Sequence, residues 1–155
     1  MRLKLGIVFL LSVFAVTACK KNVVLDPAQS KAGKTGVLTF AANELKTKGK
    51  KFDVSFTMTN EYKGMIIVKL NDMSCAQGDS AGVLKHAFFG AGERVIDLGL
   101  NQTKRFHLVC TMYGEAHGDY TVKIARVFEN PGGDGKTTGK VLATDIVWTA
   151  PEEKS

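Results

Sequence analysis

The sequence lacks an apolar run long enough to cross a membrane as a helix. The longest run, Leu5–Val16, has 12 residues, whereas a membrane-spanning helix needs about 20. Arg2 and Lys4 precede the run, and the small residues Thr17-Ala18 follow it. This order of positive, apolar and small residues is typical of a secretory signal. We therefore expect residues 1–18 to be a cleaved signal peptide.

Cysteine is also scarce, with three in the chain, and only Cys75 and Cys110 lie beyond residue 19. Export would place these two in an oxidising compartment, where an even count usually indicates a disulfide. The spacing C-x-x-C is absent, and no histidine (His86, His107, His117) groups with either cysteine as a metal ligand would. We expect a Cys75–Cys110 disulfide and no metal site.

No stretch shows a sustained period of 3.6 residues, so no long helix is expected. Apolar residues instead recur at every second position, most clearly in the run from Phe52 to Met58. Such alternation is typical of a strand with one buried face. The pattern recurs at 66–70, 106–112, 120–124 and 142–148, the last with Leu142, Thr144, Ile146 and Trp148 on the apolar face, and more weakly at 36–41, 83–89 and 93–100.

About eight short strands separated by glycine-rich turns predict an all-β domain over residues 36–150. We expect an antiparallel β-sandwich, with a closed barrel as the alternative. Gly118-Asp119-Tyr120-Thr121-Val122 resembles the tyrosine-corner stretch of immunoglobulin-like domains, which implies a sandwich of that general kind. Val122 stands where true immunoglobulin domains have their second core cysteine, and the only tryptophan, Trp148, lies in the last strand.

Val16-Thr17-Ala18-Cys19 resembles the lipobox of bacterial lipoproteins, in which small residues precede an obligatory cysteine. The resemblance implies a diacylglyceryl group on the Cys19 sulfur, cleavage just before Cys19, and acylation of the new amino group, for example with palmitate. It also implies a cell-envelope location. Lys20 replaces the aspartate that tends to retain enterobacterial lipoproteins in the inner membrane, so we expect the outer membrane.

The segment after the lipobox contains proline, serine, glycine and four lysines, with little apolar pattern. We expect residues 19–35 to be the lipid anchor and a flexible tether with a reach of about 20 to 25 Å. Residues 151–155 are expected to be a disordered tail. Residues 1–18 hold two of the 21 basic residues and none of the 15 acidic ones, so the remainder carries a net charge of +4.

Gly78-Asp79-Ser80 resembles the segment around the nucleophile of chymotrypsin-like proteases, which implies Ser80 as the nucleophile. That family places its histidine before the serine, whereas every histidine here follows Ser80, and Ala81 replaces a glycine. We expect a polar turn and no enzyme, with an envelope hydrolase using Ser80 as the alternative. Two Gly-Lys-Thr strings lack the rest of a phosphate-binding loop, so no cofactor is expected.

Four lysines (Lys46, Lys48, Lys50, Lys51) cluster at one predicted hairpin. They suit contact with anionic lipid or an acidic glycan, but we favour a solvated turn whose lysines deter edge-to-edge aggregation. Nucleic acid is not expected, because no aromatic residues are interleaved with the lysines.

Phe88 and Phe89 face opposite sides of a predicted strand. One ring is therefore either exposed as a partner contact or buried beneath the 71–82 loop. Together these features predict a lipid-anchored, non-enzymatic module that binds another envelope protein or a glycan.

Overall fold

In the computed structural model, residues 21–23, 33–86, 95–133 and 138–152 are described. These ranges hold eleven strands and one 3₁₀ turn, with no α-helix among them. The elements are β1 (Lys21–Val23), β2 (Gly33–Lys34), β3 (Leu38–Lys48), β4 (Lys51–Asn60), β5 (Ile66–Lys69), η1 (Leu70–Asp72), β6 (Met73–Gln77), β7 (Ser80–His86), β8 (Val95–Leu98), β9 (Thr103–Met112), β10 (Tyr120–Glu129) and β11 (Val141–Ala150). None of the described residues belongs to a helix long and apolar enough to span a bilayer.

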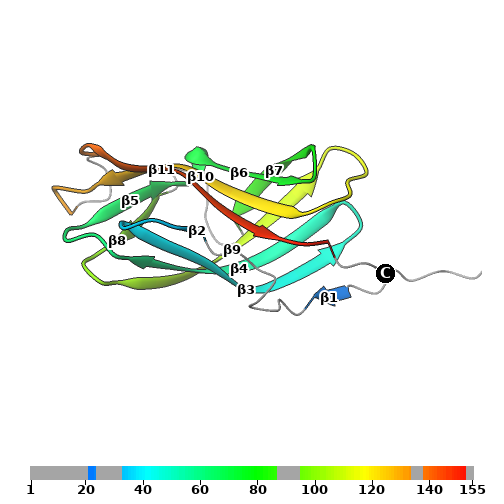
Figure 1. The fold of residues 1–155 in the computed structure, drawn as a ribbon, viewed down its shortest axis with the longest axis horizontal. Helices are drawn as coiled ribbons and strands as arrows, with labels where there is room; N and C mark the ends of the chain where they lie inside the picture. Colours follow the sequence, from blue (N-terminus) through cyan, green and yellow to red (C-terminus); the bar gives the residue numbers. More distant parts are fainter. Residues whose placement is uncertain (1–20, 24–32, 87–94, 134–137, 153–155) are drawn as a thin grey trace, which may run out of the picture.

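The strands form a two-layered antiparallel sandwich (Figure 1). One layer has the order β1-β3-β4-β9-β7, with β2 also paired to β3. In the other layer β10 pairs with β11 on one side and with β5 and β6 on the other, and β8 pairs with β5. The β6–β7 hairpin joins the two layers. The predicted all-β, antiparallel sandwich is confirmed, with more strands than the eight expected.

The core lies between the layers and follows the predicted alternation. On β4, Phe52, Val54, Phe56 and Met58 are at most 1% exposed. Phe56 joins the layers, because its ring centroid lies 4.1 Å from that of Phe40 on β3 and 5.1 Å from that of Trp148 on β11. Stacked and edge-on aromatic pairs contribute about 0.5–1.5 kcal/mol each beyond burial of their area.

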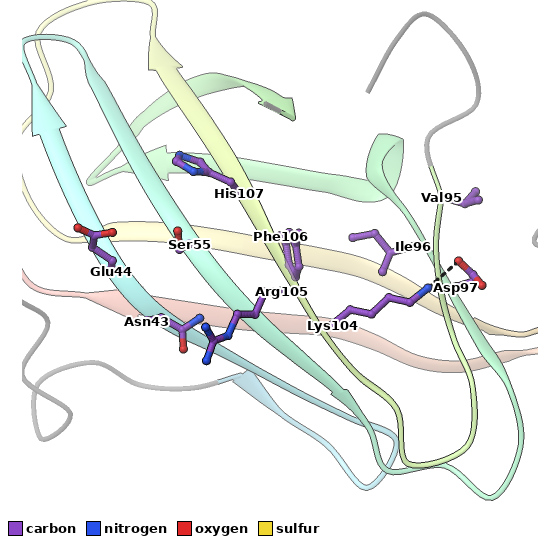
Figure 2. Close-up of a pocket in the computed structure, with 10 residues that line it drawn as sticks. All are labelled: Asn43, Glu44, Ser55, Val95, Ile96, Asp97, Lys104, Arg105, Phe106 and His107. Carbon is purple, nitrogen blue, oxygen red and sulfur yellow. Dashed lines mark hydrogen bonds and ion pairs between the residues drawn. The ribbon is translucent and has the colours of Figure 1, made fainter. Parts of the chain in front are cut away.

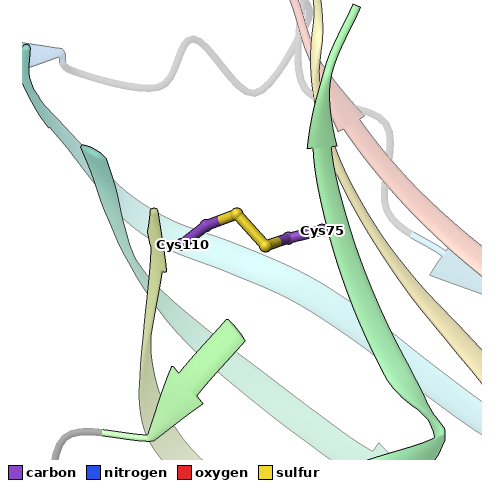
Figure 3. Close-up of a disulfide and its surroundings, with 2 residues drawn as sticks. All are labelled: Cys75 and Cys110. Carbon is purple, nitrogen blue, oxygen red and sulfur yellow. A yellow bond between two sulfur atoms is a disulfide. The ribbon is translucent and has the colours of Figure 1, made fainter. Parts of the chain in front are cut away.

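The predicted disulfide between Cys75 on β6 and Cys110 on β9 is present (Figure 3), and β7 lies between these two strands in the pairing order. Cys75 on β6 pairs with Gly82 on β7, and Gly82 pairs in turn with Met112 on β9. Strands are spaced by about 4.8 Å, so a flat arrangement would separate β6 from β9 by about 9.5 Å. The two cysteine Cα atoms are only 6.2 Å apart. The sheet therefore folds sharply at β7, where it passes from one layer to the other.

The prediction that Thr144 belongs to the buried face of the last strand is wrong. Ile146 and Trp148 are buried, but Thr144 and Asp145 are both exposed. Asp145 has φ of +56°, in the left-handed region, which aspartate tolerates better than most residues. This residue interrupts the two-residue period of β11, and its carboxylate forms an ion pair with Lys123 on β10.

The predicted strand 66–70 is shorter, because Leu70 lies in η1. The neighbouring Ile67 is fully buried although it faces away from the main core. It pairs with Phe128, whose ring lies under the Lys69 amine at 5.4 Å and the Arg126 guanidinium at 5.2 Å. Long cationic side chains cover apolar surface in this way while their charged ends remain near water.

The segment predicted to be a free tether contains two short strands. Residues 21–23 form β1 against Leu45–Thr47 of β3, and Gly33–Lys34 form β2 against Thr39 and Phe40. Part of the predicted tail is also ordered, since the Glu152 carboxylate accepts a hydrogen bond of 2.6 Å from the Gly118 N–H. The folded domain therefore extends beyond residues 36–150.

Candidate functional site

A groove of about 970 Å³ crosses the first half of β9 (Figure 2). Its position follows from strand pairing: β4 pairs with β9 along its whole length, whereas β7 pairs with β9 only from Leu108 to Met112. Within the described residues, the other edge of Thr103–His107 therefore has no partner strand. The residues that line the groove are Asn43, Glu44, Ser55, Val95, Ile96, Asp97, Lys104, Arg105, Phe106 and His107.

The apolar part of the groove is formed by Phe106 and Ile96. The Phe106 ring is half-buried and stacks at 5.7 Å on Phe56 and at 6.1 Å on Phe40, so it belongs to the aromatic cluster of the core. Ile96 projects from β8 in the opposite layer. An aromatic ring held by core packing is a rigid surface that a ligand can contact without ordering it first.

The polar wall comes from side chains on the outer face of β3, β4 and β9. Ser55 lies between Glu44 and His107 in one cross-strand row, and Thr57 pairs with Arg105 in the next row. A register shift between Ala42 and Glu44 leaves both Asn43 and Glu44 exposed. Such a bulge redirects side chains out of the regular alternation. At this bulge the Asn43 amide nitrogen lies 2.8 Å from the Thr57 hydroxyl as a donor, and the Asn43 amide oxygen lies 3.1 Å from the same hydroxyl as an acceptor.

Most charges of the groove are paired. Lys104 donates a 3.0 Å hydrogen bond to Asp97, and this bond lowers the pKa of the Asp97 carboxyl below its ordinary value. Glu44 pairs with Lys46 at 2.7 Å. Arg105 has neither an ion pair nor a side-chain hydrogen bond within the described residues, and Figure 2 shows its guanidinium directed toward Asn43. In the part of the chain that the structure describes, the wall therefore presents a planar cation without an ion-pair partner.

His107 contributes a second unsatisfied group. Its Nε2 atom is buried and has no hydrogen-bond partner in the described part of the chain. Ser55 is its cross-strand neighbour and Glu44 lies beyond Ser55. A catalytic triad needs the histidine between the serine and the acid, whereas here the serine is in the middle. The row suits hydrogen bonding to a ligand better than nucleophilic attack.

The predicted site residues lie elsewhere. Gly78 and Asp79 form the tight turn of the β6–β7 hairpin, and Ser80 begins β7, so this segment is the polar turn expected. In the described ranges Ser80 forms no hydrogen bond with a histidine side chain. The hairpin lysines lie at the β3–β4 turn and line neither wall of the groove. Cys19, Phe88 and Phe89 are outside the described residues.

A smaller pocket of about 460 Å³ lies at one end of the sandwich, between the β3–β4 and β6–β7 turns and the 113–119 loop. Glu152 supports it by bonding to the Gly118 N–H and lying 3.5 Å from Nδ1 of His117. The Gly118 N–H, followed by His117, lowers the pKa of the Glu152 carboxyl. No group of three potential metal ligands occurs among residues 33–86, 95–133 and 138–152.

Comparison of the chain with protein-family models, with curated proteins and with solved structures gives no match. The groove therefore has to be interpreted from its own chemistry. Arg105, Asn43 and Ser55 were not singled out from the sequence, because outward-facing polar residues on alternating strands look like an ordinary solvated face. The one available signal was that His107 and Arg105 lie two positions apart on one strand. Both face polar residues of the partner strand.

Proposed function

We propose that this chain is a non-enzymatic binding module, attached to a bacterial envelope by lipid on Cys19, with the β8–β9 groove as its ligand site. The lipobox resemblance supports anchorage, and Lys20, in place of the aspartate that retains enterobacterial lipoproteins in the inner membrane, favours the outer membrane. The observation that carries the binding function is the Arg105 guanidinium, which has no ion pair among the described residues, in a groove that the Phe106 ring also lines.

The size and charge of the groove favour a compact anionic ligand. Pockets for small ligands have volumes of about 300–1,000 Å³, and this groove is near the upper end of that range. Arginine binds planar carboxylates through two parallel hydrogen bonds. The hydroxyl, amide and imidazole groups of Ser55, Asn43 and His107 suit a ligand rich in hydroxyl groups. We infer an acidic sugar unit of an envelope glycan as the ligand class.

The anchor is tested by metabolic labelling with an alkyne analogue of palmitate. We expect the wild-type protein to be labelled and to sediment with membranes, and Cys19→Ala to lose both properties. Cys75→Ala/Cys110→Ala is the matched control, because it removes the other two cysteines and should leave labelling unchanged. Labelling that persists in Cys19→Ala would exclude this attachment site.

The groove is tested by calorimetric titration with trigalacturonate and with neutral maltotriose as a trisaccharide of similar size. We expect only the acidic sugar to bind, and Arg105→Gln to weaken binding by at least tenfold, because a charge-assisted hydrogen bond contributes about 1.5–3 kcal/mol. Lys85→Gln removes an exposed charge from β7, outside the groove, and should have no effect. Equal binding of both sugars, or full affinity in Arg105→Gln, would refute the assignment.

A further inference from the structure

The first described strand, β1, lies beside the end of β3 that leads into the β3–β4 turn. Lys21, Asn22 and Val23 of β1 pair with Thr47, Lys46 and Leu45 of β3. Cys19 is two residues before Lys21, and an extended chain spans at most about 3.6 Å per residue. Cys19 is therefore connected to β1 by no more than about 7 Å of chain. The β3–β4 turn follows directly after the residues that β1 contacts (Figure 1).

Three exposed lysines occupy that turn. Lys48 pairs with Lys51 across the hairpin, and Gly49 and Lys50 form its two-residue loop, with φ of +55° at Gly49. Lys48, Lys50 and Lys51 have no ion-pair partner among the described residues, whereas Lys46 is held by Glu44. The hairpin tip therefore presents three exposed positive charges close together, none of which forms an ion pair within the described part of the chain.

These lysines do not protect a free strand edge. Next to the tip, β3 is paired with β1 on one side and with β4 on the other. β4 is in turn paired with β9, with Lys51 opposite Thr111. Lysines on an edge strand prevent aggregation by repelling a second sheet, but both strands of this hairpin already have two neighbours here. The interpretation favoured from the sequence alone therefore loses its main support.

An exposed aromatic side chain lies beside the lysines. Tyr113 is 77% exposed, the highest value among the large apolar side chains described. Its neighbour Met112 donates a 2.8 Å backbone hydrogen bond to the Lys50 carbonyl. The 113–119 loop, which begins with Tyr113, therefore starts next to the tip of the β3–β4 hairpin. Tyrosine is enriched where one end of a side chain is apolar and the other is wet, as at the headgroup level of a membrane.

We propose that Lys48, Lys50, Lys51 and Tyr113 form a contact surface for anionic phospholipid headgroups, and that this surface orients the domain on its membrane. The proposal rests on the proposed anchor at Cys19, which places the same end of the domain at the bilayer. Among the described residues, neither Asp79, Asp119 nor Glu115 forms an ion pair with Lys48, Lys50 or Lys51. Asp79 and Asp119 lie at the β6–β7 turn, where the Asp119 carbonyl accepts from the Gly78 N–H, and Glu115 is the one acid that shares a pocket with Lys50.

The test uses the chain from residue 19 onward with Cys19→Ser, which retains every described strand and removes the lipid. Its binding to vesicles of 30% phosphatidylglycerol in phosphatidylcholine is measured by co-sedimentation. Each lysine near an anionic surface contributes about 1 kcal/mol, so Lys48→Gln/Lys50→Gln/Lys51→Gln should reduce partitioning about a hundredfold. Added salt should reduce binding of the parent chain, and vesicles of phosphatidylcholine alone should not bind it.

The matched control removes three lysines from other surfaces. Lys63 follows the end of β4 away from the tip, Lys140 bonds to Glu129 at that same end of the sandwich, and Lys85 lies on β7; all three are exposed. Lys63→Gln/Lys85→Gln/Lys140→Gln has the same net charge as the tip variant and should retain most of the binding. Equal losses in the two variants would show a general charge effect and overturn the proposal, as would absence of binding by the parent chain.

A second measurement uses the lipidated protein. Tyr113→Trp introduces a fluorophore at the proposed contact, and brominated lipids should quench it, whereas the buried Trp148 of the parent protein should be little affected. An unquenched fluorophore at position 113 in a membrane-bound protein would overturn the proposed orientation. Absence of palmitate labelling in the wild-type protein would instead refute the anchor alone, since vesicle binding by the Cys19→Ser chain does not depend on acylation.

Discussion

Replacing Gly82 with alanine places a methyl group where the disulfide already lies. A Cβ atom at Gly82 would be 2.5 Å from Cys110 Sγ and 3.1 Å from Cys75 Sγ, and closer still to Cε of Met112. The end of the methionine side chain can move, but the sulfur atoms are held from two strands. Overpacking of a closed core costs about 1–3 kcal/mol, and we expect Gly82→Ala to be at the upper end of this range.

The same substitution should be nearly harmless without the disulfide. Cys75→Ala/Cys110→Ala removes both sulfur atoms and lowers stability by about 4 kcal/mol in the chain-entropy account, given the separation of 35 residues. In that background the Gly82→Ala methyl group occupies vacated space, so its cost should fall below about 1 kcal/mol. The two changes should therefore show a coupling energy of about 2 kcal/mol, as residues in direct contact do.

Urea unfolding of the four proteins measures this coupling. Trp148 is the only tryptophan and is fully buried, so its fluorescence reports loss of the core. Unchanged m-values would show that the comparison concerns stability and not a different unfolded state. Equal costs of Gly82→Ala with and without the disulfide would refute the idea that the bridge crosses tightly over β7.

Three further perturbations test other parts of the structure. Gly78→Ala should destabilise by at least about 2 kcal/mol in thermal unfolding, because its Cβ would collide with the His117 carbonyl and its φ is +52°. Gly49→Ala is the matched control: its φ of +55° is similar, but no atom lies within 4 Å of the added Cβ. It should therefore cost only about 1 kcal/mol. Glu152→Gln should make the free energy of unfolding depend less on pH in the acidic range. The pKa of the Glu152 carboxyl is lowered in the folded state, so its stabilising contribution is present above the unfolded-state pKa and is lost as pH falls through the folded-state pKa. An identical pH dependence in Glu152→Gln would contradict this. Phe56→Ala should cost about 3–5 kcal/mol by calorimetry, since the ring contacts Phe40, Phe106 and Trp148.

Alternation was informative where a strand faces one core throughout its length. Phe52 to Met58 on β4 and Leu108 to Met112 on β9 follow the two-residue period, and both lie in the middle of a layer. The disulfide followed from the even cysteine count beyond residue 19, the expected export and the absence of C-x-x-C spacing. The period failed at Asp145, a left-handed residue that is exposed together with Thr144, and at Ile67, which is buried on the outer face.

The groove was beyond prediction from the sequence for a different reason. Its wall depends on register: Ser55 meets His107 only because β4 and β9 pair in one alignment, and Asn43 reaches Thr57 only because β3 bulges. Neither alignment has a local sequence signature. The pairing of β1 with β3 is similar, since Lys21–Val23 is too short to show any period. Contacts between distant segments determine both features, so only the folded arrangement reveals them.

The pairing of β1 with β3 also determines how far the proposed ligand groove would lie from the membrane. A free tether of residues 20–35 would let the domain stand about 20 to 25 Å from the proposed anchor at Cys19, but β1 leaves only one residue, Lys20, between Cys19 and the sheet. Ser55 lies four residues along β4 from Lys51, or about 13 Å at the rise of an extended strand. With the hairpin tip on the headgroups, the groove would open close above the membrane surface. A lengthened linker between Cys19 and Lys21 should therefore leave trigalacturonate affinity unchanged in solution, while it weakens binding of the anchored protein to a glycan that is itself attached to the membrane.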